Sequence, residues 1–274
     1  MTDRVRSFTP IRVEEFLAAT PDAPADLIEG LLGPGEVAVL GAEPKLGKTW
    51  LVLQAAIAAA SGAPLAAHWP VPKRVRTLLV VEEGRPGDLK DRLTQLLPVA
   101  GGTAALDLFV LPFQGFRLDA PDDVAELIRQ IEILEIGLVV LDPLYRMHRQ
   151  DENDAVAMRP VITAMRTIAD TGAAVLLVHH LRKPARDGRS GGGASGAELR
   201  GTGALHAAYD TGILLAAKPD SQHLLVHVER RSGTGDDLEL LRGVDGPGFI
   251  VVPAELAPPT GTAAGVRRRP PRGR

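Results

Sequence analysis

The sequence predicts an α/β fold in which helices flank a mostly parallel sheet, with antiparallel strands near the C-terminus. Short apolar runs alternate with segments of helical spacing between residues 37 and 180, a pattern typical of βαβ units. The run Gly137–Asp142 is apolar up to its final aspartate, as expected of a parallel strand buried on both faces. From Gly212 onward the runs are short and joined by Gly/Asp turns, which favours antiparallel pairing.

The first strand leads into a predicted phosphate-binding loop. Val37–Leu40 is a short apolar strand, Gly41–Thr49 is a turn that ends in Gly-Lys-Thr, and Trp50–Ala60 is an apolar helical run. This order directs backbone N–H groups and the positive end of a helix dipole at an anion. Lys48 is expected to reach the β/γ-phosphates, and the Thr49 hydroxyl is expected to hold Mg²⁺. The predicted nucleotide-binding residues are Gly41, Ala42, Glu43, Pro44, Lys45, Leu46, Gly47, Lys48, Thr49 and Trp50.

One position departs from the usual G-x-x-x-x-G-K-[ST] pattern. Ala42 stands where the first glycine is expected, and Gly41 lies one residue earlier. Alanine is tolerated there if the backbone φ is negative and is harmful if φ is positive. The alternative interpretation is a chance Gly-Lys-Thr after a strand.

The chain divides into a lead-in, one main domain and a tail. Residues 1–35 are rich in Pro and Gly, with a short amphipathic helix expected at Val13–Ala19 and an apolar turn against the core at Asp26–Leu32. Residues 36–257 form the main domain, and residues 258–274 are a Pro/Gly/Arg tail that we expect to be disordered. The other predicted helices are Leu89–Leu97, Val124–Leu134 and Val156–Thr171, and the other predicted strands are Val75–Val81, Leu106–Leu111, Ala173–Val178, Gly212–Ala216, His223–Glu229, Leu238–Leu241 and Phe249–Val252.

Composition excludes several classes of protein. The 274 residues contain no cysteine, so a disulfide framework and any cysteine-based zinc site are excluded. The N-terminus is polar and lacks the apolar run of a signal peptide, and no apolar stretch is long enough to span a membrane. We therefore expect a cytoplasmic protein with no membrane partner.

Charge is distributed unevenly along the chain. The net charge is −3, and removing the five arginines of the tail from Val266 leaves a body of −8. Nucleic-acid contacts are therefore expected only in loops or in the tail. The segment Lys183–Gly203 combines Gly and Ser with basic side chains, which suits contact with a phosphate backbone. It has no aromatic residue for base stacking, and a flexible linker is the alternative. The predicted nucleic-acid residues are Lys183, Arg186, Arg189 and Arg200.

Acidic residues follow two of the predicted strands. Asp142 closes an apolar strand, as a metal-orienting acid must, and is expected to hold Mg²⁺ opposite Thr49. The alternative is a helix-capping aspartate. Glu82 and Glu83 end the strand expected beside the phosphate-loop strand, where a carboxylate can polarise an attacking water. We assign Glu82 as the base ahead of Glu83, and a solvated strand end is the alternative.

Two further groups are candidates for sensing or completing the site. His179 and His180 end the strand after Asp142 and are expected near the γ-phosphate, with His180 slightly favoured. Zinc binding or a buried histidine are the alternatives, although adjacent strand residues point to opposite faces and so disfavour a shared metal. Arg231 ends a late strand and is expected to enter a neighbouring subunit's site as an arginine finger, ahead of Arg230. A solvated hairpin tip is the alternative.

Several motifs together resemble a known family. Gly41–Trp50, Val81–Gly84, Leu138–Leu144, Val178–Lys183 and Leu199–Gly203 occur in the order found in the AAA_25 group of RecA-like P-loop ATPases. The best-known member of that group is the RepA-type hexameric replicative helicase of plasmids. The likeness covers the chain from about Asp26 to Val252. It implies a RecA-like sheet, a ring of subunits and ATP bound between neighbours.

The resemblance also implies roles for individual residues. Lys48 and Thr49 become nucleotide and Mg²⁺ ligands, Asp142 the Walker B acid, Glu82 the base and Arg231 the residue in the neighbour's site. The histidine pair is placed at the γ-phosphate, and the Lys183–Gly203 segment faces the ring channel. The expected function is an ATP-hydrolysing motor on single-stranded DNA, a ring-forming helicase that works with other replication proteins. A regulatory or loader ATPase that does not unwind, and a nucleotide-dependent DNA-binding module with little turnover, remain the alternatives.

Overall fold

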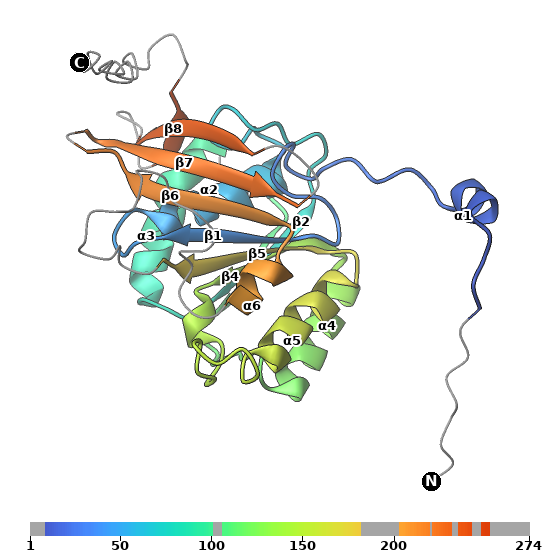
Figure 1. Ribbon diagram of the computed structural model, residues 1–274. Coiled ribbons are helices and arrows are strands. Elements are labelled where there is room, and N and C mark those ends of the chain that lie inside the picture. Colours follow the sequence, from blue (N-terminus) through green and yellow to red (C-terminus); the bar gives the residue numbers. More distant parts are fainter. Residues whose placement is uncertain are drawn as a thin grey trace, which may run out of the picture.

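The expected mostly parallel sheet is present in the computed structural model (Figure 1), which describes residues 9–100, 106–181, 203–219, 221–231, 235–242 and 248–252. In this part of the chain nine strands follow the order β3-β2-β4-β5-β1-β6-β7-β8-β9. The strands from β3 to β6 in this order are parallel, and β7, β8 and β9 continue antiparallel. The strands are β1 (Val37–Ala42), β2 (Arg76–Val81), β3 (Leu108–Pro112), β4 (Ile136–Asp142), β5 (Ala174–His180), β6 (Thr211–Ala217), β7 (His223–Arg230), β8 (Asp236–Arg242) and β9 (Phe249–Val251).

Prolines set where three of the helices begin. Pro86, Pro121 and Pro160 each occupy the first turn of a helix, where the missing N–H costs nothing. The third of these helices therefore starts later than the spacing from Val156 predicts. The helices are α1 (Val13–Ala19), α2 (Lys48–Ser61), α3 (Pro86–Leu96), η1 (Leu97–Ala100), α4 (Pro121–Leu134), η2 (Leu144–Arg146), α5 (Arg159–Ala169) and α6 (Gly203–Ala208). The short helix α6 was not among the predicted elements.

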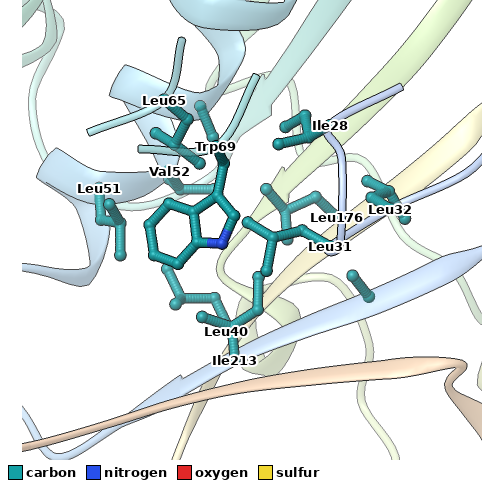
Figure 2. Close-up of a pocket in the computed structure, with 12 residues that line it drawn as sticks. Ile28, Leu31, Leu32, Leu40, Leu51, Val52, Leu65, Trp69, Leu176 and Ile213 are labelled. Atoms are coloured by element: carbon teal, nitrogen blue, oxygen red, sulfur yellow. The ribbon is translucent and has the colours of Figure 1, made fainter. Parts of the chain in front are cut away.

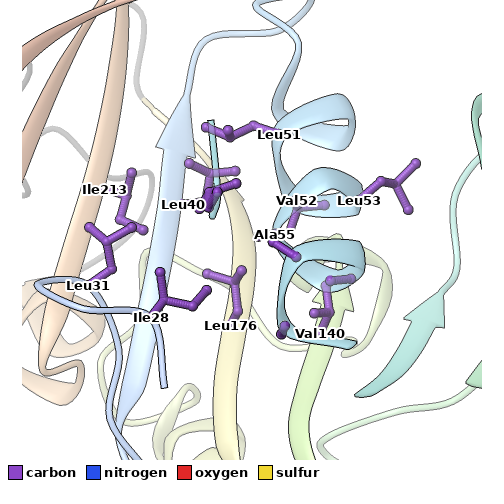
Figure 3. Packing of buried hydrophobic residues seen from close by; sticks show 14 of the residues in the cluster. Ile28, Leu31, Leu40, Leu51, Val52, Leu53, Ala55, Val140, Leu176 and Ile213 are labelled. Carbon is purple, nitrogen blue, oxygen red and sulfur yellow. The ribbon is translucent and has the colours of Figure 1, made fainter. Parts of the chain in front are cut away.

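Helices cover both faces of the sheet and enclose two apolar cores. Helices α2 and α3 lie on one face, whereas α4, α5 and α6 lie on the other (Figure 1). Successive residues of β1 divide between the cores, because side chains alternate across a strand. Leu40 packs with Leu51, Val52 and Ala55 of α2 (Figure 3), and Val39 belongs to the core beneath α4 and α5. This double burial makes β1 a rigid support for the loop that follows it.

The apolar turn predicted at Asp26–Leu32 packs into the core. Ile28 bridges to Leu32, and both side chains are buried. With Leu31 and Trp69 they line a small apolar cavity beside α2 (Figure 2). Its lining offers no charged group, so we assign it a packing role. Helix α1 forms at the predicted residues but buries none of its side chains.

The position of β2 differs from the sequence-based expectation. We expected it beside the phosphate-loop strand, but β4 and β5 separate β2 from β1. Helix α2 packs over β1, β5, β4 and β2, so the chain leaving this helix re-enters the sheet three places away. The carboxyl ends of these parallel strands nevertheless lie on the same side of the sheet, which brings the acids after β2 and at the end of β4 toward the phosphate loop.

Candidate active site

An open pocket lies at the carboxyl ends of the parallel strands, between the start of α2 and the ends of β2, β4 and β5. This is where α/β sheets bind ligands. Side chains from six segments of the chain converge on it. Its lining residues are Pro44, Lys45, Gly47, Lys48, Thr49, Trp50, Glu83, Gly84, Arg92, Asp142, Pro143, Val178, His180 and Arg242.

The backbone of the predicted phosphate loop has the required shape. Gly47 caps α2 with a left-handed φ of 88°, a conformation that favours glycine, and α2 begins at Lys48. Ala42 instead belongs to strand β1 and is not among the residues with positive φ. The departure from the usual glycine pattern is therefore harmless, because an extended residue accepts a Cβ atom.

Lys48 is buried and held by the loop itself. Its Nζ donates to the carbonyl oxygens of Ala42 at 2.9 Å and of Glu43 at 2.8 Å. Burial lowers the pKa of Lys48 below its usual value, and the charges of Asp142, Glu83 and Glu43 oppose that shift. An anion that enters the pocket can reach this ammonium group by taking the place of the two carbonyl oxygens.

The side chains of Thr49 and Asp142 place two oxygen atoms side by side at the pocket. Asp142 is buried at the end of β4, and its carboxylate is hydrogen-bonded by the Thr49 side chain. Burial raises the pKa of Asp142 to about 6, the Thr49 bond opposes this, and the charge of Glu83 adds to it. A hydroxyl and a carboxylate are hard oxygen donors of the kind that Mg²⁺ prefers, so this pair fits the predicted metal role.

The two glutamates after β2 point to different surroundings, and this difference bears on the choice between them. The Glu82 carboxylate accepts backbone N–H bonds from Gln114, Gly115 and Phe116 at 3.0–3.1 Å. It therefore braces the turn after β3 and does not line the pocket. Glu83 lines the pocket and accepts a 2.7 Å hydrogen bond from the Tyr145 hydroxyl. Geometry favours Glu83 for the role that we had assigned to Glu82.

The histidine pair divides between the two faces of β5, as expected of adjacent strand residues. His180 pairs in register with Ala42, lines the pocket and lies 5.3 Å from the Tyr145 ring. His179 is buried on the opposite face, 3.9 Å from the Glu152 carboxylate. No group of three histidine or acidic residues in the described ranges is arranged to hold a metal ion. The pocket geometry favours His180 as the residue near a bound phosphate.

A cationic and aromatic wall completes the pocket. The guanidinium groups of Arg92 and Arg242 lie 5.8 Å and 5.3 Å from the centre of the Trp50 ring. Phe249 of β9 contacts the phosphate loop, since a Cβ atom on Gly47 would lie 2.7 Å from its ring. Of these residues only Trp50 was predicted. Arg242 and Phe249 reach the site through β8 and β9, a long-range arrangement for which the sequence carries no local signal.

Arg230 and Arg231 lie away from this pocket. Arg230 pairs with Thr211 at the start of β6. Both arginines therefore lie at the amino ends of the parallel strands, and the phosphate loop follows the carboxyl end of β1. Arg230 forms a 2.8 Å ion pair with Asp26, and only 17% of its side chain is exposed. Arg231 is 56% exposed and donates to the carbonyls of Ala207 and Tyr209. Neither can serve its own pocket, and Arg231 is the more accessible.

Other predictions fall outside what the structure describes. Lys183, Arg186, Arg189 and Arg200, the tail 258–274, and Ser232 and Gly233 lie outside the described residues. Among the described residues, no helix combines the length and apolar character required to cross a membrane.

The fold and the pocket define a RecA-like P-loop nucleotide-binding protein. The AAA_25 family model, an AAA domain, matches residues 3–186. The chain belongs to this family.

Similar folds occur among solved structures. One solved ATPase domain matches with a TM-score of 0.64 and 14% identity over 88% of this chain and 96% of that one. The structure of a DnaB-like replicative helicase, described together with its interactions with primase, matches with a TM-score of 0.63 and 14% identity over 87% of this chain. This chain spans 66% of the length of that helicase. A KaiC-like protein from Pyrococcus horikoshii OT3 matches with a TM-score of 0.55 and 15% identity over 84% of this chain and 99% of its own.

Proposed function

We propose that this chain is an ATP-hydrolysing, Mg²⁺-dependent motor that acts on single-stranded DNA as one subunit of a homo-oligomeric ring, a hexamer of the replicative-helicase type. The observation that carries the proposal is the convergence of Lys48, Thr49, Asp142, Glu83 and His180 on one pocket. This set supplies a phosphate-binding cation, two metal ligands, a base and a polar group at the end of a strand. Membership of an ATPase family and the likeness to ATPase and replicative-helicase folds support it.

Each residue has a defined task in hydrolysis. The start of α2 and Lys48 bind the phosphates of ATP, and Thr49 and Asp142 would hold Mg²⁺, which would neutralise charge on the phosphates. Glu83 accepts the proton of a water whose oxygen bonds to the γ-phosphorus. The bond from that phosphorus to the bridging oxygen breaks, and ADP leaves with the electron pair. His180 contacts the γ-phosphate. Trp50, with Arg92 and Arg242 beside it, offers a surface against which the adenine ring of ATP can lie.

The test of the motor is steady-state ATP hydrolysis with and without single-stranded DNA, with Lys48→Ala as the inactive control. We expect turnover that DNA stimulates. Turnover indifferent to DNA would indicate the regulatory or loader ATPase, and the absence of turnover would indicate a nucleotide-dependent binding module. The net charge of −8 outside the Arg-rich tail is the observation that keeps the regulatory alternative in view.

The DNA contact is proposed to lie in the Lys183–Gly203 segment. Replacing Lys183, Arg186 and Arg189 by Ser removes three positive charges, and each lost phosphate contact reduces the salt slope by about 0.7 for a single strand. We expect binding to weaken and its dependence on salt concentration to flatten, as measured by fluorescence anisotropy across a salt series. If deletion of residues 266–274 had this effect and the triple substitution did not, the tail would be the binding element.

A further inference from the structure

Tyr145 joins two residues of the pocket that come from different strands. It lies in η2, three residues after Asp142. Its hydroxyl donates to Glu83 Oε1 at 2.7 Å, and its ring lies 5.3 Å from the His180 ring at an interplanar angle of 51°. Burial raises the pKa of Tyr145 to about 12, and the bond to Glu83 and its charge add to this. The hydroxyl therefore stays protonated and remains a donor near neutral pH.

The turn that carries Tyr145 is firmly anchored. Leu144 and Met147, on either side of Tyr145, are fully buried, and the Leu118 N–H donates to the Met147 carbonyl at 2.7 Å. The Arg146 guanidinium lies 5.9 Å from the centre of the Tyr145 ring. A side chain that projects from such a support has little freedom, which is the property required of a group that orients another.

We infer that Tyr145 is a positioning residue for hydrolysis, whose hydroxyl orients the Glu83 carboxylate and whose ring holds His180 beside it. This inference rests on the proposed role of Glu83 as the base. A bond to Oε1 restricts rotation of the carboxylate and leaves Oε2 to accept the proton of the attacking water. The ring contact sets the distance between the base and the residue proposed to meet the γ-phosphate. The chain thereby aligns two groups with one side chain.

The geometry singles out Tyr145 among the neighbours of Glu83. The adjacent Glu82 is fixed by three backbone N–H groups of the turn after β3, so it offers no support to the pocket. Asp142 is acidic and repels the Glu83 charge. Among the contacts of the described residues, the Tyr145 hydroxyl is the donor that holds the Glu83 carboxylate.

The test compares kcat, KM and the affinity for a non-hydrolysable ATP analogue in Tyr145→Phe and wild type, with and without single-stranded DNA. Tyr145→Phe removes the hydroxyl and keeps the ring contact with His180. We expect kcat to fall by about tenfold to a hundredfold, the scale of a small misplacement of a reacting group, with KM and affinity nearly unchanged. Tyr145→Leu, which removes both contacts, should lower kcat further.

Two controls separate positioning from general damage. Thr167→Val removes a hydroxyl that bonds to the Thr163 carbonyl on the exposed side of α5, and it should leave all three constants unchanged. In a Glu83→Gln background, Tyr145→Phe should have little further effect, because no carboxylate remains to be oriented. Thermal melting of each variant reports whether the fold is retained.

The outcomes distinguish this inference from the proposed function. If Glu83→Gln is inactive and the kcat of Tyr145→Phe equals or exceeds that of wild type, the positioning role of Tyr145 is overturned and the proposed function stands. Wild-type turnover in Glu83→Gln would overturn the assignment of the base, and with it the proposed mechanism. A fall in affinity that matches the fall in kcat would show that Tyr145 binds the nucleotide and does not position the base.

Discussion

At the scale of single residues, two neighbouring glutamates show what a motif leaves undecided. The sequence places Glu82 and Glu83 together at the end of a strand, but adjacent residues there face different ways. Which one meets the pocket depends on where the strand ends and on the turn beyond β3, whose backbone N–H groups bind the Glu82 carboxylate. The local sequence predicts neither the residue at which β2 ends nor the position of the turn after β3.

The two glutamates should behave differently when each is made neutral. Glu83→Gln should retain ATP binding and lose turnover by roughly 10²–10⁴, the usual contribution of a positioned base. Glu82→Gln should keep turnover and lose about 1–3 kcal/mol of stability, because an amide has only one acceptor oxygen and at least one of the three N–H groups loses its partner. Single-turnover hydrolysis and thermal melting measure the two effects. The reverse pattern, with Glu82→Gln inactive, would restore our sequence-based assignment.

Asp210 links the start of β1 to helix α5, and its ionisation gives a stability prediction that depends on pH. It accepts hydrogen bonds from the Val37 N–H at 2.9 Å and from Arg166 at 2.7 Å. Burial opposes its ionisation, but the Arg166 bond, the Val37 bond and the nearby positive charges outweigh this and hold the pKa of Asp210 below its usual value. Ionised Asp210 therefore stabilises the folded chain above the unfolded pKa of roughly 3.9, and the effect is lost as pH falls through the folded pKa.

Asp210→Asn should accordingly destabilise the protein by about 1–2 kcal/mol near neutral pH, a value reduced from that of a buried pair because Arg166 is partly exposed. The difference from wild type should hold from about pH 7 to about pH 4 and shrink as the solution is acidified further toward about pH 2, because the folded pKa lies below the unfolded value. Denaturant unfolding at several pH values measures it. A difference that stays constant across this range would mean that the charge of Asp210 does not stabilise the fold.

At the scale of elements, β9 connects the C-terminal hairpins to the phosphate loop. The Gln54 side chain on α2 pairs with both backbone groups of Phe249, donating to its carbonyl at 2.9 Å and accepting its N–H at 2.7 Å. The Phe249 ring then lies against Gly47, whose positive φ and lack of a side chain leave room for it. A strand far along the chain thus supports the predicted phosphate-binding loop.

Gln54→Leu should loosen this support. It leaves two backbone groups of Phe249 without their partner, at a cost of about 1–3 kcal/mol. We expect weaker nucleotide affinity and a lower melting temperature, measured by titration with an ATP analogue and by calorimetry. The matched control is Gln130→Leu, which removes a half-buried side chain on α4 that donates to Glu126 away from the nucleotide pocket. Nucleotide affinity equal in the two variants would contradict a role for β9 at the site.

At the scale of the whole molecule, the sequence predicts those parts of the site that are contiguous. Strand, loop and helix around Lys48 are encoded within a few residues, and Asp142 and His180 end strands that are largely apolar. The order of strands is not encoded in this way, and β2 entered the sheet away from β1 because α2 spans several strands. Arg242 and Phe249 reach the pocket only after the antiparallel strands fold back toward α2, so no local pattern predicts them.

The same architecture separates Arg231 from the pocket of its own subunit. The phosphate loop follows the carboxyl end of β1, whereas Arg231 follows β7 at the level where β1 begins. The six residues of β1 span roughly 20 Å, which is farther than an arginine side chain extends. A catalytic role for Arg231 therefore requires a second copy of the chain. In that role its guanidinium would exchange the carbonyls of Ala207 and Tyr209 for the neighbour's γ-phosphate.

Arg231→Ala should lower turnover by about 10³-fold or more with nucleotide affinity nearly unchanged, because an arginine finger stabilises the transition state and contributes little to the ground state. Arg230→Ala is a contrasting variant. It breaks the ion pair with Asp26, and we expect it to reduce stability more than turnover.

The sharper measurement mixes two inactive proteins, Lys48→Ala and Arg231→Ala, before assembly. Some interfaces then combine an intact phosphate loop with an intact Arg231, so ATP hydrolysis should reappear and depend on the mixing ratio. Full activity in Arg231→Ala alone, with the protein still oligomeric, would show that the residue does not act in trans.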